Sequence, residues 1–176
     1  MCKLYLVKPD LLHFDAYNDM MREWTEAGGS ITPWFLDAPC EFSEFADLVK
    51  ELDACEKGTH DDIYAASSSY FLMDENHRLC GATSLRHYLT QDGFERWGHI
   101  GYGIRPSERN KGLGTKALQM MLEEAKKHHL DRVLLGAYVS NTASCRVIEK
   151  CGGKLLRVSH SEKEPEEIRQ YIIDLF

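Results

Sequence analysis

The chain has 176 residues, of which 21 are basic and 28 acidic, and its formal net charge is −7. Its hydrophobic content of 43% is ordinary for a globular protein, and its length suffices for one full core. The acidic balance argues against a nucleic-acid partner, which requires a basic surface. No apolar run approaches the roughly 20 residues of a membrane helix, so we expect a single cytoplasmic domain, residues 1–176, with no membrane partner.

The cysteines and histidines show no metal-binding pattern. The six cysteines form no C-x-x-C pair, and none stands at a zinc-site spacing from any of the eight histidines. His128 and His129 end a predicted helix, where partial positive charge suits the helix dipole. We therefore expect reduced cysteines and no metal site.

The N-terminal part predicts one strand followed by two helices. The strand is expected at residues 4–7. Asp10 suits the start of the next helix, because acidic groups stabilise that end, and Gly28 ends it. Residues 30–41 form an irregular loop with aromatic side chains, and a second helix covers about residues 43–57.

The rest of the chain predicts a mixed sheet with helices. Short runs of apolar residues predict strands at residues 70–73, 79–87, 99–104, 133–139, 154–160 and 170–176. A polar turn at residues 74–77 joins the first two, because it holds short polar residues that hairpins prefer. Residues 90–97 are expected as a polar connection and residues 161–167 as a solvated charged loop. The expected fold class is α/β with a mixed sheet and helices packed on its faces.

One stretch, residues 98–127, combines a strand, a polar loop and a helix. The helix has one buried face, made by Leu118, Met121, Leu122 and Ala125. Its first turn has N–H groups without an intrahelical partner, and the peptide dipoles add about half a positive charge there.

The loop before this helix carries the pattern R-x-x-G-x-G, made by Arg109, Gly112 and Gly114. The glycines allow positive φ angles and the close approach of a ligand. Arg109 and Lys111 add full positive charges. The stretch therefore predicts a cradle for a phosphate or pyrophosphate group.

The same glycines, with Ala117, also fit the dinucleotide fingerprint G-x-G-x-x-[GA]. That motif requires a tight turn directly after its strand and a second βαβ half. Here a long polar loop separates the strand from the glycines, and fewer than 60 residues follow Ala117, which is too few for the usual second half. A Walker P-loop is excluded because G-K-[ST] is missing.

The order of strand, Arg105-Pro106, R-x-x-G-x-G and amphipathic helix resembles the acetyl-CoA-binding motif of the GNAT superfamily of N-acetyltransferases. A second stretch, residues 141–153, resembles the family's N-x-x-[AS]-x-x-x-[YF]-E-K-x-G-[FG] helix. The two motifs stand in the family's order and spacing and cover residues 98–153. The N-terminal half matches only in its outline of elements.

The resemblance implies a central, mostly antiparallel sheet with splayed middle strands and helices on both faces. It implies acetyl-CoA as co-substrate, with pantetheine against the backbones of Tyr102, Gly103 and Ile104 and also bonded by Asn141 and Ser144. The pyrophosphate would lie against Arg109, Asn110, Lys111, Gly112, Leu113, Gly114 and Thr115.

The catalytic residues that relatives commonly use are absent. Ile148 stands where many relatives place a tyrosine acid, and Gly136 where some place a glutamate. His99 is the candidate base, because its unperturbed pKa of about 6.5 suits proton transfer near neutrality. Tyr102 is a second candidate base and Tyr138 a candidate acid; the alternative for His99 is a hydrogen-bonded structural histidine.

The resemblance implies transfer of an acetyl group from acetyl-CoA to a primary amine of a small molecule, peptide or protein that the sequence does not identify. One alternative is a GNAT-fold protein that binds CoA as a sensor or interaction module without catalysis. Another is a different nucleotide-dependent enzyme. Dimers are common in this superfamily, so a homodimer is compatible with the resemblance.

Overall fold

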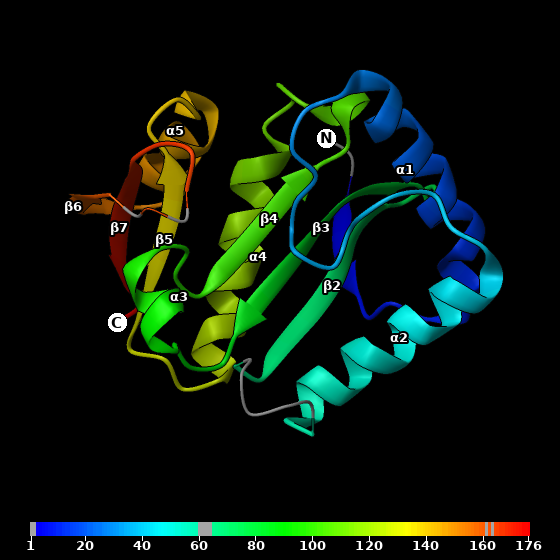
Figure 1. Cartoon of the computed structure of the whole chain (residues 1–176), viewed down its shortest axis with the longest axis horizontal. Helices are drawn as coiled ribbons and strands as arrows, with labels where there is room; N and C mark the ends of the chain where they lie inside the picture. Colours follow the sequence, from blue (N-terminus) through cyan, green and yellow to red (C-terminus); the bar gives the residue numbers. More distant parts are fainter. Residues whose placement is uncertain (1–2, 60–64, 161, 163) are drawn as a thin grey trace.

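The computed structural model describes residues 3–59, 65–160, 162 and 164–176 (Figure 1). The elements in chain order are β1 (Leu4–Val7), η1 (Leu11–His13), α1 (Phe14–Ala27), α2 (Phe42–Lys57), β2 (Ser67–Asp74), β3 (Leu79–Arg86), α3 (Gln91–Glu95), β4 (Ile100–Ile104), η2 (Pro106–Glu108), α4 (Leu113–Lys127), β5 (Arg132–Tyr138), α5 (Thr142–Lys150), β6 (Lys154–Ser159) and β7 (Ile168–Asp174). Within the described residues, no helix is long and apolar enough to cross a membrane.

The strands form two antiparallel sheets, one in the order β1-β2-β3-β4 and the other in the order β5-β7-β6. The strands β4 and β5 face each other between the sheets and diverge along their length (Figure 1). A bridge between Gly98 and Leu135 joins the chain just before β4 to β5. The predicted fold class, with splayed middle strands and helices on both faces, is confirmed.

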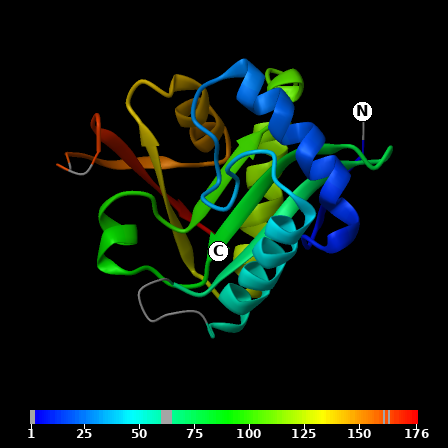
Figure 2. The ribbon, with the colours of Figure 1, turned by 45° about the vertical axis from the view of Figure 1, so that its right-hand side comes forward.

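The two faces of the four-stranded sheet are covered by different helices. Helices α1 and α2 lie on one side and α4 on the other (Figure 2). Residues that alternate along β3 follow this division, because successive side chains point to opposite faces. Ala82 packs in the cluster of α1 and α2, whereas Leu85 packs with Leu118 and Met121 of α4.

Helix boundaries follow the sequence signals in the N-terminal part. The Asp10 side chain caps η1 by accepting from the Leu12 N–H at 2.8 Å, and α1 follows directly. Gly28 ends α1, and Gly58 ends α2 in the left-handed conformation. The irregular loop at residues 30–41 is also as predicted.

Two sequence expectations differ from the structure. The connection at residues 90–97 contains the short helix α3, whose start is capped by the Thr90 hydroxyl, which accepts from the Gly93 N–H at 3.3 Å. Gly93 made this segment look like a loop in the sequence, but the cap at Thr90 suffices to stabilise one short helix. In the charged loop, of which residues 161 and 163 lie outside the described part, Glu164 is buried against Arg96 and Tyr138.

Glycines permit the close contact at which β4 and β5 meet. Gly98 has φ +72°, and a Cβ there would lie 2.0 Å from the carbonyl oxygen of Leu134. A Cβ at Gly136 would lie 2.1 Å from the carbonyl oxygen of Arg96. Real side chains do not approach a backbone oxygen this closely, so the junction of the two sheets requires glycine at both places.

We predict that Gly98→Ala destabilises the protein more than Gly112→Ala does. Both glycines have positive φ, so both changes carry about 1–2 kcal/mol of left-handed strain. A Cβ at Gly112 meets nothing within 4 Å, whereas at Gly98 it meets backbone and adds about 1–3 kcal/mol of overpacking. Urea denaturation measures both variants, and equal losses would contradict the packing argument.

Candidate active site

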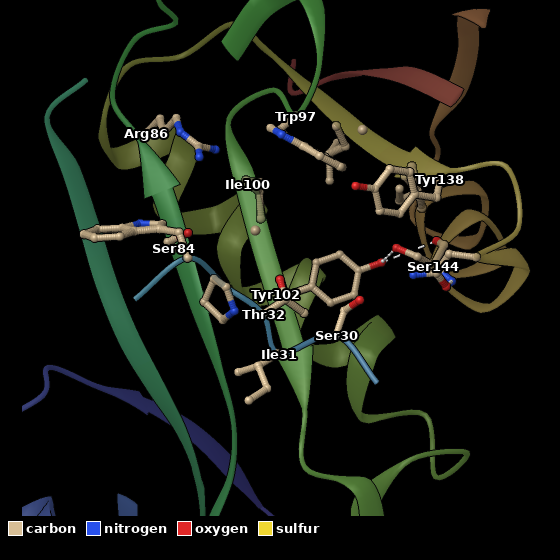
Figure 3. Close-up of a pocket in the computed structure, with 18 residues that line it drawn as sticks. Ser30, Ile31, Thr32, Ser84, Arg86, Trp97, Ile100, Tyr102, Tyr138 and Ser144 are labelled. Carbon is tan, nitrogen blue, oxygen red and sulfur yellow. Dashed lines mark hydrogen bonds between the residues drawn. The ribbon is translucent and has the colours of Figure 1, made fainter. Parts of the chain in front are cut away.

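A cavity of about 400 Å³ lies where β4 and β5 diverge (Figure 3). Its walls come from the loop after α1, the ends of β3 and α3, the facing strands and α5. The lining residues are Ser30, Ile31, Thr32, Pro33, Trp34, Ser84, Arg86, Trp97, Ile100, Gly101, Tyr102, Leu135, Gly136, Ala137, Tyr138, Asn141, Ser144 and Ile148.

Both faces of the four-stranded sheet contribute to this cavity. Ile100 belongs to the core beneath α4, and Tyr102 packs against the same core. Ser84 and Gly101 pair across β3 and β4 and point to the opposite face, where the loop with Pro33 lies. The cavity therefore reaches from the α4 and α5 side to the side of the loop.

The free edge of β4 offers backbone groups to the cavity. The backbone N–H of Arg86 donates to the His99 carbonyl at 2.8 Å, and the backbone N–H of Arg105 donates to the Cys80 carbonyl at 2.9 Å. Hydrogen-bonded pairs alternate along an antiparallel ladder, so the backbone of Gly103 also faces β3. The groups directed toward β5 therefore belong to Ile100, Tyr102 and Ile104, whereas the Gly103 backbone, where a pantetheine contact is expected from the sequence, is directed toward β3.

The glycines of β4 make room for another segment of the protein. A Cβ at Gly103 would lie 2.0 Å from the Thr32 carbonyl oxygen, and one at Gly101 would lie 3.3 Å from Pro33. The group that approaches these glycines is the protein's own loop, which crosses β4 on the side of α1 and α2.

The start of α4 suits an anion. Gly112 precedes the helix with φ +80°, no side chain caps the first turn, and that turn holds no acidic residue. By contrast, the side chains of Thr90 and Asn141 cap α3 and α5. A Cβ at Gly112 would meet nothing within 4 Å. The N–H groups of the first turn are thus left for a ligand, as the predicted phosphate cradle requires.

The basic residues of the cradle loop are exposed and have contacts within the protein. Arg109 donates through Nε to the Ile104 carbonyl at 3.1 Å, and its guanidinium lies 5.3 Å from the Trp24 ring centroid. Lys111 lies 3.1 Å from a Glu108 oxygen. Asn110 between them has φ +61°. Leu113, Gly114 and Thr115 form the first turn of α4 that follows.

Arg105 holds this loop to α1, a role that the sequence analysis did not identify. Its guanidinium is buried, bonds Glu23 and lies 2.8 Å from an Asp19 oxygen. Glu23 also accepts from the Ser107 N–H at 2.6 Å. Burial raises the pKa of Glu23, but these hydrogen bonds outweigh burial and lower it overall.

Tyr102 connects β4 to the start of α5. Its hydroxyl lies 2.9 Å from Ser144 Oγ (Figure 3), and Asn141 Oδ1 accepts from the Ser144 N–H at 3.0 Å. Burial raises the pKa of Tyr102 to about 12. Burial and the hydrogen bond to Glu164 raise the pKa of Tyr138 to about 12 as well. Both phenols therefore remain protonated near neutral pH and can act there only as donors.

His99 lies at the junction of the two sheets and does not line the cavity. Its backbone N–H donates to the Leu134 carbonyl at 2.7 Å, and its ring Nδ1 accepts from the Leu134 N–H at 3.0 Å. Burial lowers the pKa of His99 to about 4. Protonation at Nδ1 would break the bond to Leu134, so this geometry favours the structural alternative over the predicted base.

Comparison with known proteins places the chain in a family. A family model for the acetyltransferase (GNAT) domain matches residues 3–154, so the chain belongs to the GNAT acetyltransferases. Comparison with curated protein sequences gave no match.

Solved structures share the fold at low identity. The microcin C7 self-immunity acetyltransferase MccE, in complex with acetyl-CoA and AMP, is 15% identical, with a TM-score of 0.71 over 98% of this chain and 92% of that one. The ribosomal L7/L12 alpha-N-protein acetyltransferase RimL is 18% identical, with a TM-score of 0.68 over 99% and 95%. A mutant form of the spermidine/spermine N-acetyltransferase SpeG from Vibrio cholerae is 16% identical, with a TM-score of 0.65 over 98% of this chain and 94% of that one.

We predict that His99→Ala destabilises the fold, because it leaves the buried Leu134 N–H without its acceptor. The expected loss is about 1–3 kcal/mol of unfolding free energy, measured in urea. His160→Ala, at an exposed histidine, is the control and should change stability by less than about 0.5 kcal/mol. A His99→Ala protein as stable as the control would remove the structural role.

Proposed function

We propose that this chain is a single-domain N-acetyltransferase that moves an acetyl group from acetyl-CoA to a primary amine. The observation that carries the proposal is one continuous arrangement. An uncapped α4 N-terminus at Gly112 follows a strand, β4, whose free edge borders a cavity. Structures of relatives with bound acetyl-CoA or CoA support the choice of co-substrate.

Each part of acetyl-CoA has a matching environment in this chain. The pyrophosphate would meet the first-turn N–H groups of α4, with Arg109 and Lys111 beside them. The pantetheine arm, which carries amide groups, would pair with the free backbone groups of Tyr102, with the Ile104 N–H and with Asn141. Acetyl-CoA supplies the activated acyl group, and the chain supplies its orientation.

The transfer needs few side chains. The amine nitrogen attacks the thioester carbonyl, the C–N bond forms and the C–S bond breaks, so CoA leaves as a thiolate. A backbone N–H on the free edge of β4 can stabilise the oxyanion that forms in between. The Tyr102 or Tyr138 hydroxyl can protonate the thiolate, a role that Ile148 cannot fill, and the amine gives its proton to solvent.

Among the described residues that line the cavity, the titratable side chains are Arg86, Tyr102 and Tyr138. Burial lowers the pKa of Arg86, but guanidinium keeps its charge, and both phenols have pKa values raised to about 12. None of them changes its charge near neutral pH. Positioning of the amine against the thioester is therefore the main source of the rate.

We predict that Gly112→Asp abolishes acetyl-CoA binding, whereas Gly112→Asn retains most of it. Asn and Asp both tolerate the left-handed conformation that Gly112 adopts, so the pair differs chiefly in charge. The carboxylate would repel the pyrophosphate, whereas the neutral amide of Asn would not. Thermal shift and calorimetry with acetyl-CoA measure the difference, with NAD and ATP as competing ligands.

Three outcomes of these measurements separate the candidate functions. Binding together with turnover of an amine supports the proposal. Binding without turnover of any amine would favour the CoA-binding sensor. Failure of acetyl-CoA to raise the melting temperature of the wild-type protein would rule out both, because a ligand specific for the folded state must raise it.

We predict that log kcat/KM rises with a slope of about one per pH unit from pH 6 toward the pKa of the acceptor amine. The neutral amine is the nucleophile, and its fraction grows tenfold per unit below its pKa. With the pKa of His99 lowered to about 4, no break is expected near pH 6.5. A plateau above pH 6.5 that disappears in His99→Ala would instead establish His99 as the base.

A further inference from the structure

Ser84 and Arg86 line the cavity from the end of β3 and project to the same face, two residues apart (Figure 3). This is the face on which the loop with Pro33 and Trp34 lies. Acetyl-CoA, with its cradle at α4 and its arm along β4, accounts for neither residue. The two side chains therefore lie on the part of the cavity that remains for the acceptor.

Arg86 bonds a backbone carbonyl, and the described part of the chain gives it no direct ion pair. Its Nη1 donates to the Gly98 carbonyl at 3.0 Å, and it forms no ion pair with a carboxylate of the residues that the structure describes. The nearby Asp92 is bonded to Arg96, which also bonds Glu164. Burial lowers the pKa of Arg86, Asp92 raises it, and Arg96 lowers it further.

Ser84 is a second polar group without a partner. Its side chain is 1% exposed, and its Oγ makes no hydrogen bond. It faces Gly101 on β4, where a Cβ would come within 3.1 Å of that Oγ. A buried hydroxyl without a partner costs stability, so a ligand that accepts its hydrogen bond gains correspondingly.

We infer that Arg86 and Ser84 form a subsite for a carboxylate of the acceptor, so that the substrate is an amine of the amino-acid class. The inference rests on the proposed function and deepens it. A guanidinium has several N–H donors in a fixed plane and matches a carboxylate with two of them.

The charge at this subsite also excludes a class of acceptor. The guanidinium of Arg86 is partly buried and is offset only by Asp92, which is bonded to Arg96, so it repels a second cation, and the low dielectric of the cavity strengthens that repulsion. A polyamine carries further ammonium groups besides the one that reacts. SpeG, a spermidine/spermine N-acetyltransferase, shares the fold of this chain, but Arg86 is unfavourable to such substrates here.

The test compares acceptors with and without the carboxylate, and each rate is divided by the fraction of neutral amine, because conversion to the amide also lowers the pKa of the α-amine. Acetyl transfer is measured for the twenty common L-amino acids, each beside its α-amide, and for spermidine. The best amino acid should exceed its amide in kcat/KM by about tenfold or more, because charged hydrogen bonds are the strong ones. Spermidine should be slower than that amino acid.

Variants assign the preference to the subsite. Arg86→Gln retains a donor for the Gly98 carbonyl and should reduce the ratio of acid to amide to about one. Arg86→Lys should keep part of the ratio, and Ser84→Ala should lower it by a smaller factor. Acetyl-CoA affinity should not change in any of them. Arg22→Gln, at an exposed arginine on α1, removes the same charge and should leave the ratio intact.

Binding of the reaction product provides a second test that does not require turnover. Calorimetry in the presence of CoA should find N-acetyl amino acids bound more tightly than their amides by the wild type, and equally by Arg86→Gln. Equal binding by the wild type, equal rates for acid and amide, or a ratio that survives Arg86→Gln would overturn the inference. Absence of transfer to any amine, with the binding preference intact, would overturn the proposed acetyl transfer alone.

Discussion

The hydrogen bonds around His99 join β4 and β5 at one end of the strands. His99 bonds Leu134 through both its backbone N–H and its ring, and Gly136 donates to the Trp97 carbonyl at 3.0 Å. Beyond this point the strands diverge, so β4 keeps a free edge beside a cavity that is lined by both strands. Because a pair of strands that continued to bond would close this gap, the geometry of the junction determines whether the site exists.

A second set of contacts fixes where the cradle lies relative to that gap. Arg105, directly after β4, is buried between Asp19 and Glu23 of α1, and Glu23 holds the Ser107 N–H. These charge-assisted bonds hold the turn that leads to Gly112. Removal of a partner would leave a buried charge unpaired, which costs far more than the pair contributes, so this loop is constrained although it is polar.

Sequence patterns predicted the parts of the site that are formed by residues close together in the chain. The helix face of α4 and the glycines before it are visible in the sequence, because helical spacing and turn chemistry act within a few residues. The roles of His99 and Gly103 depended on which chain segment lies opposite, and periodicity does not contain that information. Arg86 and Ser84 escaped notice for the same reason, since their lack of partners exists only in the folded chain.

Helix α4 carries the cradle and also joins the two sheets. Leu118 and Met121 on its buried face pack in one cluster with Leu85 of the first sheet and Val133 and Tyr171 of the second. The sheets otherwise meet at the short junction around Gly98. Acetyl-CoA held at the start of α4 and along β4 would therefore stabilise the helix that connects the two sheets. Amide hydrogen exchange would then slow in β5 and β7 as well as in the segments that the ligand contacts.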